Sequence, residues 1–263
     1  MSNVRLLHPD WEYIFFDDDD IRRFVGAEFP EYQAAFDWFP YAIQRVDFFR
    51  YLAVYRLGGF YLDLDVFLCK SLIPLLGAAA VFPFEELTLN RFLREGCSMD
   101  WEIGNYAFGA AAGHPFLKAV IENCIRSQTE PEWTGLMMQG IPKMFRSDFE
   151  VLNTTGPGLL SRTLVEYRTT ARDCTILFPE DVCDPQEWHQ FGDYGVHLMA
   201  GSWRSGGGAL HQRLMRGWET WTRTRTSAGS RALGPRRTLP AAPDVSTAPA
   251  APADRCASLL TVK

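Results

Sequence analysis

Two aspartates one residue apart, Asp63 and Asp65, are the side chains of this sequence whose spacing most favours chemistry. They follow an aromatic and apolar stretch at 60–62 and precede a second apolar stretch at 66–68, which predicts a buried strand that carries both of them. Alternate side chains of a strand point the same way, so the two carboxylates should lie together. Adjacent carboxylates repel each other unless a cation lies between them. The spacing therefore predicts a site for Mg2+ or Mn2+, which prefer oxygen ligands and the oxygens of a diphosphate.

A second charged pair, Asp47 and Arg50, stands on the helix that we predict before this strand. Residues 43–57 carry apolar side chains at a spacing close to 3.6, and the glycines at 58–59 are suited to end the helix. Positions three apart share a helix face, so both side chains could reach one ligand. Taken singly, a solvated strand end explains the two aspartates, and a surface ion pair explains Asp47 with Arg50. Their occurrence in one continuous block favours a binding site.

The block from residue 47 to residue 65 resembles the sugar-binding segment of glycosyltransferase family 32, which carries a DXD motif. The shared pattern is Asp-x-x-Arg-Tyr, then a Tyr, a Gly-Gly pair and Tyr-x-Asp-x-Asp. That family includes fungal mannosyltransferases and is related to the glucosylating domains of large clostridial toxins. The resemblance implies a GT-A fold, which is a Rossmann-like α/β sandwich. It also implies a UDP- or GDP-hexose donor, a divalent metal cofactor and retention of the anomeric configuration.

The resemblance also assigns roles to residues of this block and of a later segment. Asp63 and Asp65 would bind the metal, the ribose or the donor sugar, and Asp47 and Arg50 would contact the donor sugar. Asn105 stands in a predicted strand-like segment and could approach the donor or the acceptor. Without the resemblance, an amide at a strand edge explains Asn105 equally well.

A second cluster of chemically useful residues follows the apolar alternation at 196–199, which predicts a short strand. It contains His197, Ser202 and Trp203, and it resembles the family's terminal His-x-x-x-x-Ser-Trp. By that resemblance, His197 completes the metal site, and Ser202 and Trp203 close over the diphosphate. The chemistry of the side chains agrees, because imidazole ligates divalent metals, whereas hydroxyl and indole N–H groups donate hydrogen bonds. Taken alone, His197 would be a hydrogen-bonded core histidine about as often as a ligand.

Composition divides the chain into a predicted glycosyltransferase domain, residues 1–222, and a disordered tail, residues 223–263. With 263 residues and 47% hydrophobic content, the chain suffices for one α/β domain. The tail is rich in Pro, Ala and Thr and has seven Lys/Arg against two Asp/Glu, a composition that cannot form a core. The domain therefore carries more negative charge than the overall −6. An acidic body argues against nucleic acid as a partner.

The start of the sequence differs from the family pattern. Relatives usually begin with a further strand and helix before the segment that this chain enters near His8, so we expect the sheet to lack its usual first strand. That strand helps to hold the nucleotide base. No stretch of the sequence is long and apolar enough for a signal peptide or a transmembrane helix, which predicts a cytoplasmic protein.

These observations predict a metal-dependent, retaining glycosyltransferase that moves a hexose to a hydroxyl of a glycan, lipid or protein. One alternative is a catalytically degenerate protein of the same fold that binds nucleotide sugars or other partners. A second is a HAD-type phosphatase, whose motif requires Thr or Val where this chain has Phe67. In a third, the acidic residues serve solubility alone.

Overall fold

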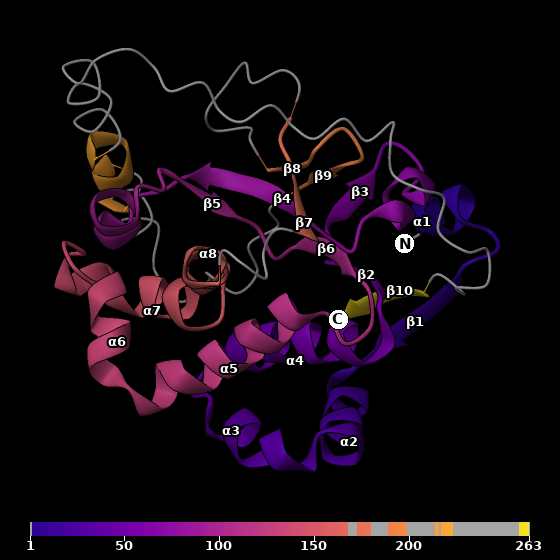
Figure 1. Ribbon diagram of the computed structural model, residues 1–263, viewed down its shortest axis with the longest axis horizontal. Coiled ribbons are helices and arrows are strands. Elements are labelled where there is room, and N and C mark those ends of the chain that lie inside the picture. Colours follow the sequence, from indigo (N-terminus) through magenta and orange to yellow (C-terminus); the bar gives the residue numbers. More distant parts are fainter. Residues whose placement is uncertain are drawn as a thin grey trace.

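A mixed β-sheet with helices packed against it forms the body of the protein (Figure 1). This computed structural model describes residues 2–167, 173–179, 189–198, 214–215, 217–222 and 258–262. The α-helices are α1 (Ser2–Leu7), α2 (Asp18–Glu28), α3 (Gln33–Trp38), α4 (Ala42–Leu57), α5 (Pro115–Thr129), α6 (Pro131–Met137), α7 (Arg146–Thr154) and α8 (Pro157–Glu166). Shorter helical turns are η1 (Pro30–Tyr32), η2 (Ile73–Gly77), η3 (Phe92–Gly96) and η4 (Lys143–Phe145). None of the helices in the described ranges is long and apolar enough to cross a bilayer.

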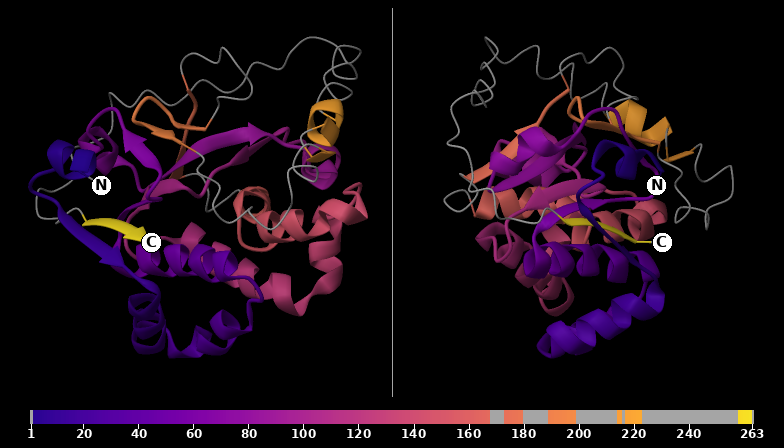
Figure 2. Two further views of the ribbon diagram at one scale, coloured as in Figure 1. Left: turned by 180° about the vertical axis from the view of Figure 1, so that it is seen from behind. Right: turned by 90° about the vertical axis from the view of Figure 1, so that its right-hand side faces the viewer.

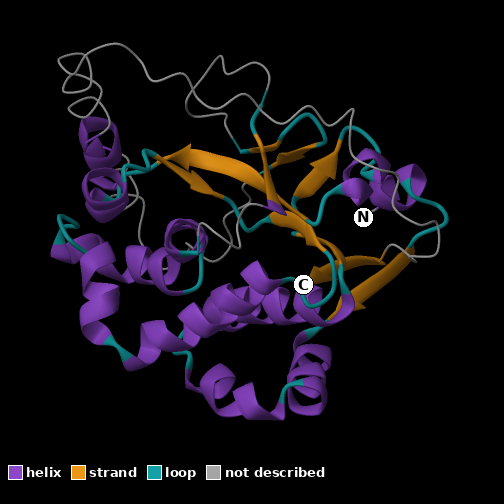
Figure 3. Cartoon of the chain, in the orientation of Figure 1, coloured by secondary structure: helices purple, strands orange, loops and turns teal. Residues whose placement is uncertain are grey.

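The strands form a large sheet and a small one. They are β1 (Glu12–Phe16), β2 (Gly59–Leu62), β3 (Val66–Leu68), β4 (Ala80–Leu87), β5 (Trp101–Ile103), β6 (Ala107–Ala110), β7 (Cys174–Leu177), β8 (Gln190–Phe191), β9 (Gly195–His197) and β10 (Ser258–Val262). The large sheet has the order β1-β10-β2-β6-β4-β5, with β7 also paired to β4, and the small sheet has the order β3-β9-β8. Helices gather on one side of the large sheet (Figure 3). This arrangement confirms the α/β class predicted from the sequence.

Helix α4 spans Ala42–Leu57, as its apolar spacing predicted, and leads directly into the central strand β2. Gly58 ends the helix with a φ of 69°, and a Cβ there would lie 2.9 Å from the backbone nitrogen of Ala112. Only glycine fits such a position without strain. Phe49 and Leu52 of α4 are completely buried. The helix is therefore held rigidly beside β2.

Strand β2 is buried on both faces, which confirms the prediction for residues 60–62. Tyr61 belongs to the core beneath α4 and α5, whereas Phe60 and Leu62 belong to the core beneath the small sheet. Side chains of a strand alternate between its faces, so a strand covered on both faces must be apolar throughout.

The two aspartates do not lie in a strand, and this prediction was wrong. Strand β2 ends at Leu62, and residues 63–65 form a turn in which the Val66 N–H donates to the Asp63 carbonyl at 3.0 Å. The chain must change direction here because β2 belongs to the large sheet and β3 to the small sheet. Aspartate is favoured in such turns, because its carboxylate accepts hydrogen bonds from nearby backbone N–H groups.

Strand β10, Ser258–Val262, corrects the prediction that residues 223–263 are disordered throughout. It lies between β1 and β2 and runs parallel to both (Figure 2). In the described structure, β10 occupies the position beside β2. Thr and Val are favoured in strands, whereas Pro and Ala, which are frequent in the sequence before β10, are not. The boundary at residue 222 stays a prediction.

Candidate metal site and its buried support

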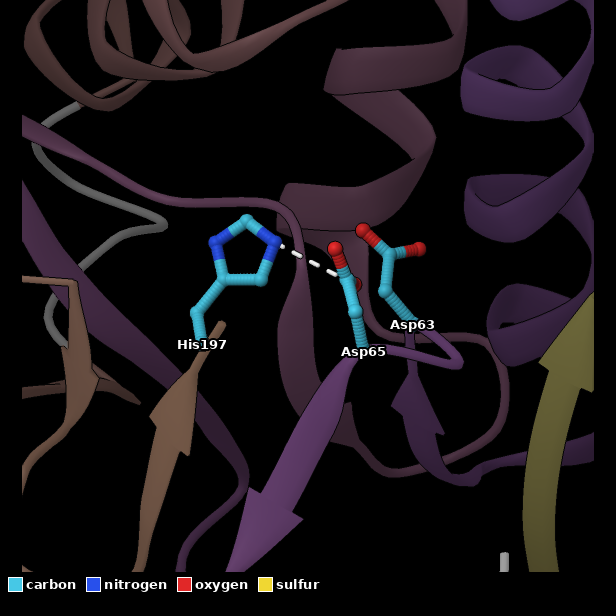
Figure 4. Close-up of side chains that lie close together, drawn as sticks. All are labelled: Asp63, Asp65 and His197. Carbon is cyan, nitrogen blue, oxygen red and sulfur yellow. Dashed lines mark ion pairs between the residues drawn. The ribbon is translucent and has the colours of Figure 1, made fainter. Parts of the chain in front are cut away.

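Asp63, Asp65 and His197 converge at the end of β2 (Figure 4). Each offers one ligand atom, and these atoms all lie within 4.8 Å of one another. The His197 Nε2 atom is 3.3 Å from Asp65 Oδ1. Two carboxylates and an imidazole are suitable ligands for a divalent cation. We call these three residues the metal triad.

The small sheet brings His197 to the two aspartates. Strand β9 runs antiparallel to β3, and His197 is the register partner of Val66. Next to this pair, the Leu198 N–H donates to the Asp65 carbonyl at 2.9 Å. The structure therefore joins the residues of the first and second sequence clusters, as the sequence analysis expected of His197.

Arg50 lies directly behind the metal triad and is 3% exposed. Its Nη2 atom is 3.0 Å from Asp47 Oδ1, and its Nη1 atom is 3.3 Å from Asp63 Oδ1. Nη1 also donates to the Asn105 carbonyl at 2.8 Å. Asp47 and Arg50 do share a helix face, but that face points into the protein. In the described structure, Arg50 contacts the triad through Asp63.

Asp47 and Asn105 form the next layer of this buried support. The Asn105 amide donates to Asp47 Oδ1 at 3.1 Å and to the Tyr51 hydroxyl at 3.0 Å. The Thr155 hydroxyl donates to Asp47 Oδ2 at 2.9 Å. Asp47 is 4% exposed and Asn105 is 7% exposed. The Asp47 carboxylate and the Asn105 amide are hydrogen-bonded to each other and to neighbouring side chains. Direct contact of either residue with a donor sugar stays a prediction.

The charges of this region favour a divalent cation. Burial raises the pKa of Asp63, against the opposing effects of the Arg50 guanidinium and the hydrogen bond from Tyr61 at 2.5 Å. Burial lowers the pKa of Arg50, but nearby carboxylates, Asp63 foremost, outweigh it and the net pKa is raised. With Asp47, Asp63 and Asp65 ionised, this region holds three carboxylates and the one guanidinium that pairs with Asp47 and Asp63, so two negative charges are left over. A divalent cation at the metal triad would neutralise them.

The pKa of Asp47 makes stability depend on pH. Burial raises this pKa from 3.8 to about 6, although Arg50 opposes the shift. The folded state then binds the proton more tightly than the unfolded chain, so this stabilisation is lost as pH rises from 3.8 to about 6. Over that range we expect wild type to lose up to about 3 kcal/mol of unfolding free energy relative to Asp47→Asn. Urea unfolding of both proteins tests this, and a pH-independent difference between them would contradict it.

Tyr106 was missed by the sequence analysis, and it stacks on the metal triad. Its ring lies 4.4 Å from the His197 ring between centroids, at an interplanar angle of 12°. Tyr106 is 2% exposed, and its hydroxyl has no hydrogen-bond partner within the described ranges. The His189 ring lies 6.5 Å from the Tyr106 ring between centroids, and His189 Nδ1 is 3.5 Å from Glu85 Oε1. An aromatic residue directly after Asn105 gives no signal in the sequence that distinguishes it from a core residue.

Replacing Tyr106 should separate the stacking of its ring from the role of its hydroxyl. We expect Tyr106→Phe to keep Mn2+ affinity and to be as stable as wild type or about 1 kcal/mol more stable, because a buried unpaired hydroxyl is unfavourable. Tyr106→Leu should weaken Mn2+ binding about 10-fold, because it no longer orients His197. Titration of free Mn2+ by electron paramagnetic resonance measures this. Equal affinities for the two variants would show that stacking has no effect on the triad.

The remaining candidate residues are Ser202, Trp203 and Thr155. Ser202 and Trp203 lie outside the described residues. Thr155, which holds Asp47, stands in the Thr-Gly-Pro turn that starts α8. A Thr-Gly-Pro run is typical of a structural turn, so local sequence does not point to Thr155 as a partner of Asp47.

Comparison with known proteins confirms the resemblance. Residues 1–82 match the family described as glycosyltransferase sugar-binding region containing DXD motif. The chain is 38% identical over 120 residues to inositol phosphoceramide mannosyltransferase 3 of Schizosaccharomyces pombe, which covers 46% of this chain and 30% of that protein. It is 28% identical over 162 residues to mannosyl phosphorylinositol ceramide synthase SUR1 of Saccharomyces cerevisiae, which covers 62% of this chain and 36% of that protein.

The chain thus spans 30% and 36% of the length of these two relatives. Among solved structures, the PaToxG glycosyltransferase shows a looser likeness, with a TM-score of 0.36 and 14% sequence identity. That likeness covers 62% of this chain and 60% of the other. Similarity at this level carries no argument about the site.

Proposed function

We propose that this chain, whose residues 1–82 match the sugar-binding region of DXD glycosyltransferases, is itself a metal-dependent glycosyltransferase. The observation that carries the proposal is the convergence of Asp63, Asp65 and His197 within 4.8 Å at the end of the central strand. These residues would hold Mn2+ or Mg2+. A bound divalent cation would neutralise charge on the departing nucleoside diphosphate, the main electrostatic contribution expected of such a site.

The protein's own residues would orient the donor and exclude water. Arg50 holds the Asp63 carboxylate from behind and compensates part of its charge. The Tyr61 hydroxyl donates to Oδ1 of the same carboxylate at 2.5 Å. In the proposal, Ser202 and Trp203 close over the diphosphate, which protects the donor from hydrolysis.

The α/β architecture, with an Asp-x-Asp turn after a central strand, supports a GT-A assignment. We assign retention of the anomeric configuration as part of the same proposal. An acceptor hydroxyl that attacks from the leaving-group side would need no nucleophile from the protein. Proton NMR of the product would identify its anomeric configuration directly.

The names of the relatives support a choice of sugar and acceptor. Those proteins are mannosyltransferases whose names specify inositol phosphoceramide or phosphorylinositol ceramide. The proposed donor for this chain is therefore a nucleotide-diphosphate mannose, with GDP or UDP as the nucleotide. The proposed acceptor is a hydroxyl of an inositol-phosphate lipid headgroup.

Thermal unfolding with a panel of GDP- and UDP-sugars, with and without Mn2+, tests this proposal. A ligand that binds the folded state alone raises the melting temperature, by an amount equivalent to about 2.7 kcal/mol at 100 times its Kd. We expect a rise that requires Mn2+ and is largest with a mannose donor. The rise should vanish in Asp63→Asn/Asp65→Asn and persist in Asp18→Asn/Asp19→Asn, which removes two exposed carboxylates instead.

Turnover separates the enzyme from a degenerate binding protein of the same fold. Donor and purified inositol phospholipid are incubated with Mn2+, and the mannosylated lipid is detected by mass spectrometry. Binding without product would favour the degenerate alternative. Absence of any Mn2+-dependent shift in a folded protein would overturn the donor site itself.

Two further expectations stay predictions. We propose that nucleic acid is not a partner, since residues 1–222 are acidic overall. We also propose a cytoplasmic location, which cell fractionation of the natural host tests.

A further inference from the structure

Strand β10 lies between β1 and β2 in the large sheet and pairs in parallel with both. All five residues of β1, Glu12–Phe16, pair in register with Ser258–Val262. On its other side, Leu259 and Leu260 pair with Phe60 and Tyr61 of β2. Among the described strands, β10 is the partner of β1. Figures 1 and 2 show it as the yellow strand beside the indigo β1.

Without β10, the sheet would contain an empty slot. Neighbouring strands lie 4.7–4.9 Å apart, so β1 and β2 are separated by about 10 Å, too far for direct backbone hydrogen bonds. With β10 in place, Phe60 and Tyr61 are only 4% and 1% exposed, and each belongs to a core cluster, so one edge of this slot lies within the core. Buried N–H and C=O groups require hydrogen-bond partners. The slot must therefore be filled by an extended segment that runs parallel to β1 and β2.

We propose that the slot between β1 and β2 is a strand-binding site, which the chain fills with its own residues 258–262 to order the metal triad. The coupling to the triad follows from the register. Leu260 pairs with Tyr61, and the Tyr61 hydroxyl donates to Asp63 Oδ1 at 2.5 Å. A strand that fixes the backbone of Tyr61 therefore fixes a contact of one triad ligand.

The covalent connection through residues 223–257 explains why the strand that fills the slot comes from the same chain. Residues 223–257 connect it to the predicted domain, and a segment of that length, at about 3.3 Å per extended residue, can span a domain of this size. Because the segment belongs to the same chain, its pairing is intramolecular, and a linker long enough to span the sites gives an effective concentration on the order of millimolar. Strand addition to a sheet edge is a common mode of peptide recognition, because main-chain hydrogen bonds supply affinity with little dependence on sequence. Binding in cis should therefore dominate at ordinary protein concentrations.

Disulfide cross-linking tests the register directly. Ile14 pairs with Leu260, and adjacent strands bring Cα atoms within the range that a disulfide spans. We expect Ile14→Cys/Leu260→Cys to form a link within one chain after mild oxidation, seen by peptide mass spectrometry. The matched control Glu12→Cys/Leu260→Cys is two residues out of register and should not link. Links between two chains, or equal linking in both variants, would overturn the assignment.

Hydrogen exchange and rescue by an added peptide test whether residues 258–262 order β1 and the metal triad. Truncation after Ala257, or Leu260→Pro, should raise amide exchange in β1 by at least about 10-fold and weaken Mn2+ binding. Ala251→Pro, in a segment that already contains prolines, is the control and should do neither. A synthetic peptide of residues 257–263 at about 1 mM should restore protection to the truncated protein. Unchanged β1 exchange after truncation would overturn the proposal.

Different results would refute the proposed function and the strand-binding proposal. This inference rests on the proposed function for the Mn2+ measurement alone, whereas cross-linking and exchange require neither donor nor metal. If truncation leaves the protein insoluble, exchange in the intact wild type decides, since the amides of residues 259–262 must then be as protected as those of β1. Exchange of those amides at the unfolded-chain rate would refute the strand assignment.

Discussion

Asp65→Asn is expected to lower kcat about 10²–10³-fold, the loss typical when one electrostatic contact to developing charge is removed. Asparagine has nearly the same shape as aspartate but no charge, and Asp65 contributes a carboxylate that lies 3.3 Å from His197 Nε2. Mn2+ affinity should fall together with kcat, because both depend on the same ligand atom. Transfer of mannose to lipid and Mn2+ titration measure the two quantities.

Stability shows whether Asp65 acts in function rather than folding. In metal-free protein, removing one of two adjacent carboxylates relieves repulsion, so the melting temperature of Asp65→Asn should equal or exceed that of wild type. Asp19→Asn, at an exposed position, should leave both activity and Mn2+ affinity unchanged. A variant that keeps wild-type kcat and Mn2+ affinity would exclude Asp65 as a metal ligand.

Arg50→Met should destabilise the protein by about 3–5 kcal/mol, the usual cost of leaving buried charges without their partner. The Arg50 side chain is 4% exposed and lies 3.0 Å from Asp47 and 3.3 Å from Asp63. Its removal would leave the buried Asp47 carboxylate and the Asp63 carboxylate, whose side chain is 25% exposed, without the positive charge that both contact. Arg50→Lys should recover part of the loss, because an ammonium cannot reproduce the forked contacts of a guanidinium. Urea unfolding at neutral pH measures the effect.

Two further variants serve as controls for Arg50→Met. Arg56 also lies on α4, but it is 57% exposed and pairs with Glu28 at the surface, so Arg56→Met should cost at most about 1 kcal/mol. Adding Asp47→Asn to Arg50→Met should recover stability, since one uncompensated carboxylate is then gone. If Arg50→Met and Arg56→Met were equally stable, Arg50 would not be the charge that supports the triad.

Local sequence was sufficient for the elements that lead into the site. The apolar spacing of residues 43–57 and the glycine at 58 predicted a helix, and α4 spans Ala42–Leu57 with Gly58 at its end. The run at 60–62 predicted a buried strand, and β2 is buried on both faces. These features depend on residues close in sequence, where side-chain period and backbone preference act directly.

Side-chain direction was harder to predict. The spacing of Asp47 and Arg50 places them on one helix face, but it does not say whether that face meets solvent or protein. Packing of α4 against the sheet turned the face inward, where the two side chains pair. The strand expected to carry Asp63 and Asp65 became a turn, because the next strand joins a different sheet. The two carboxylates still converge, through a different backbone geometry.

By itself, then, the sequence determined the helix, the buried strand, the acidic pair and the likeness to DXD glycosyltransferases, because each is a pattern within a short stretch. Only the tertiary structure decided that His197 meets Asp65, that Arg50 and Asp47 support the triad from within the core, and that Ser258–Val262 lies between β1 and β2. Such pairings join residues far apart in the chain. Their register follows from packing of the whole domain, and no local period specifies it.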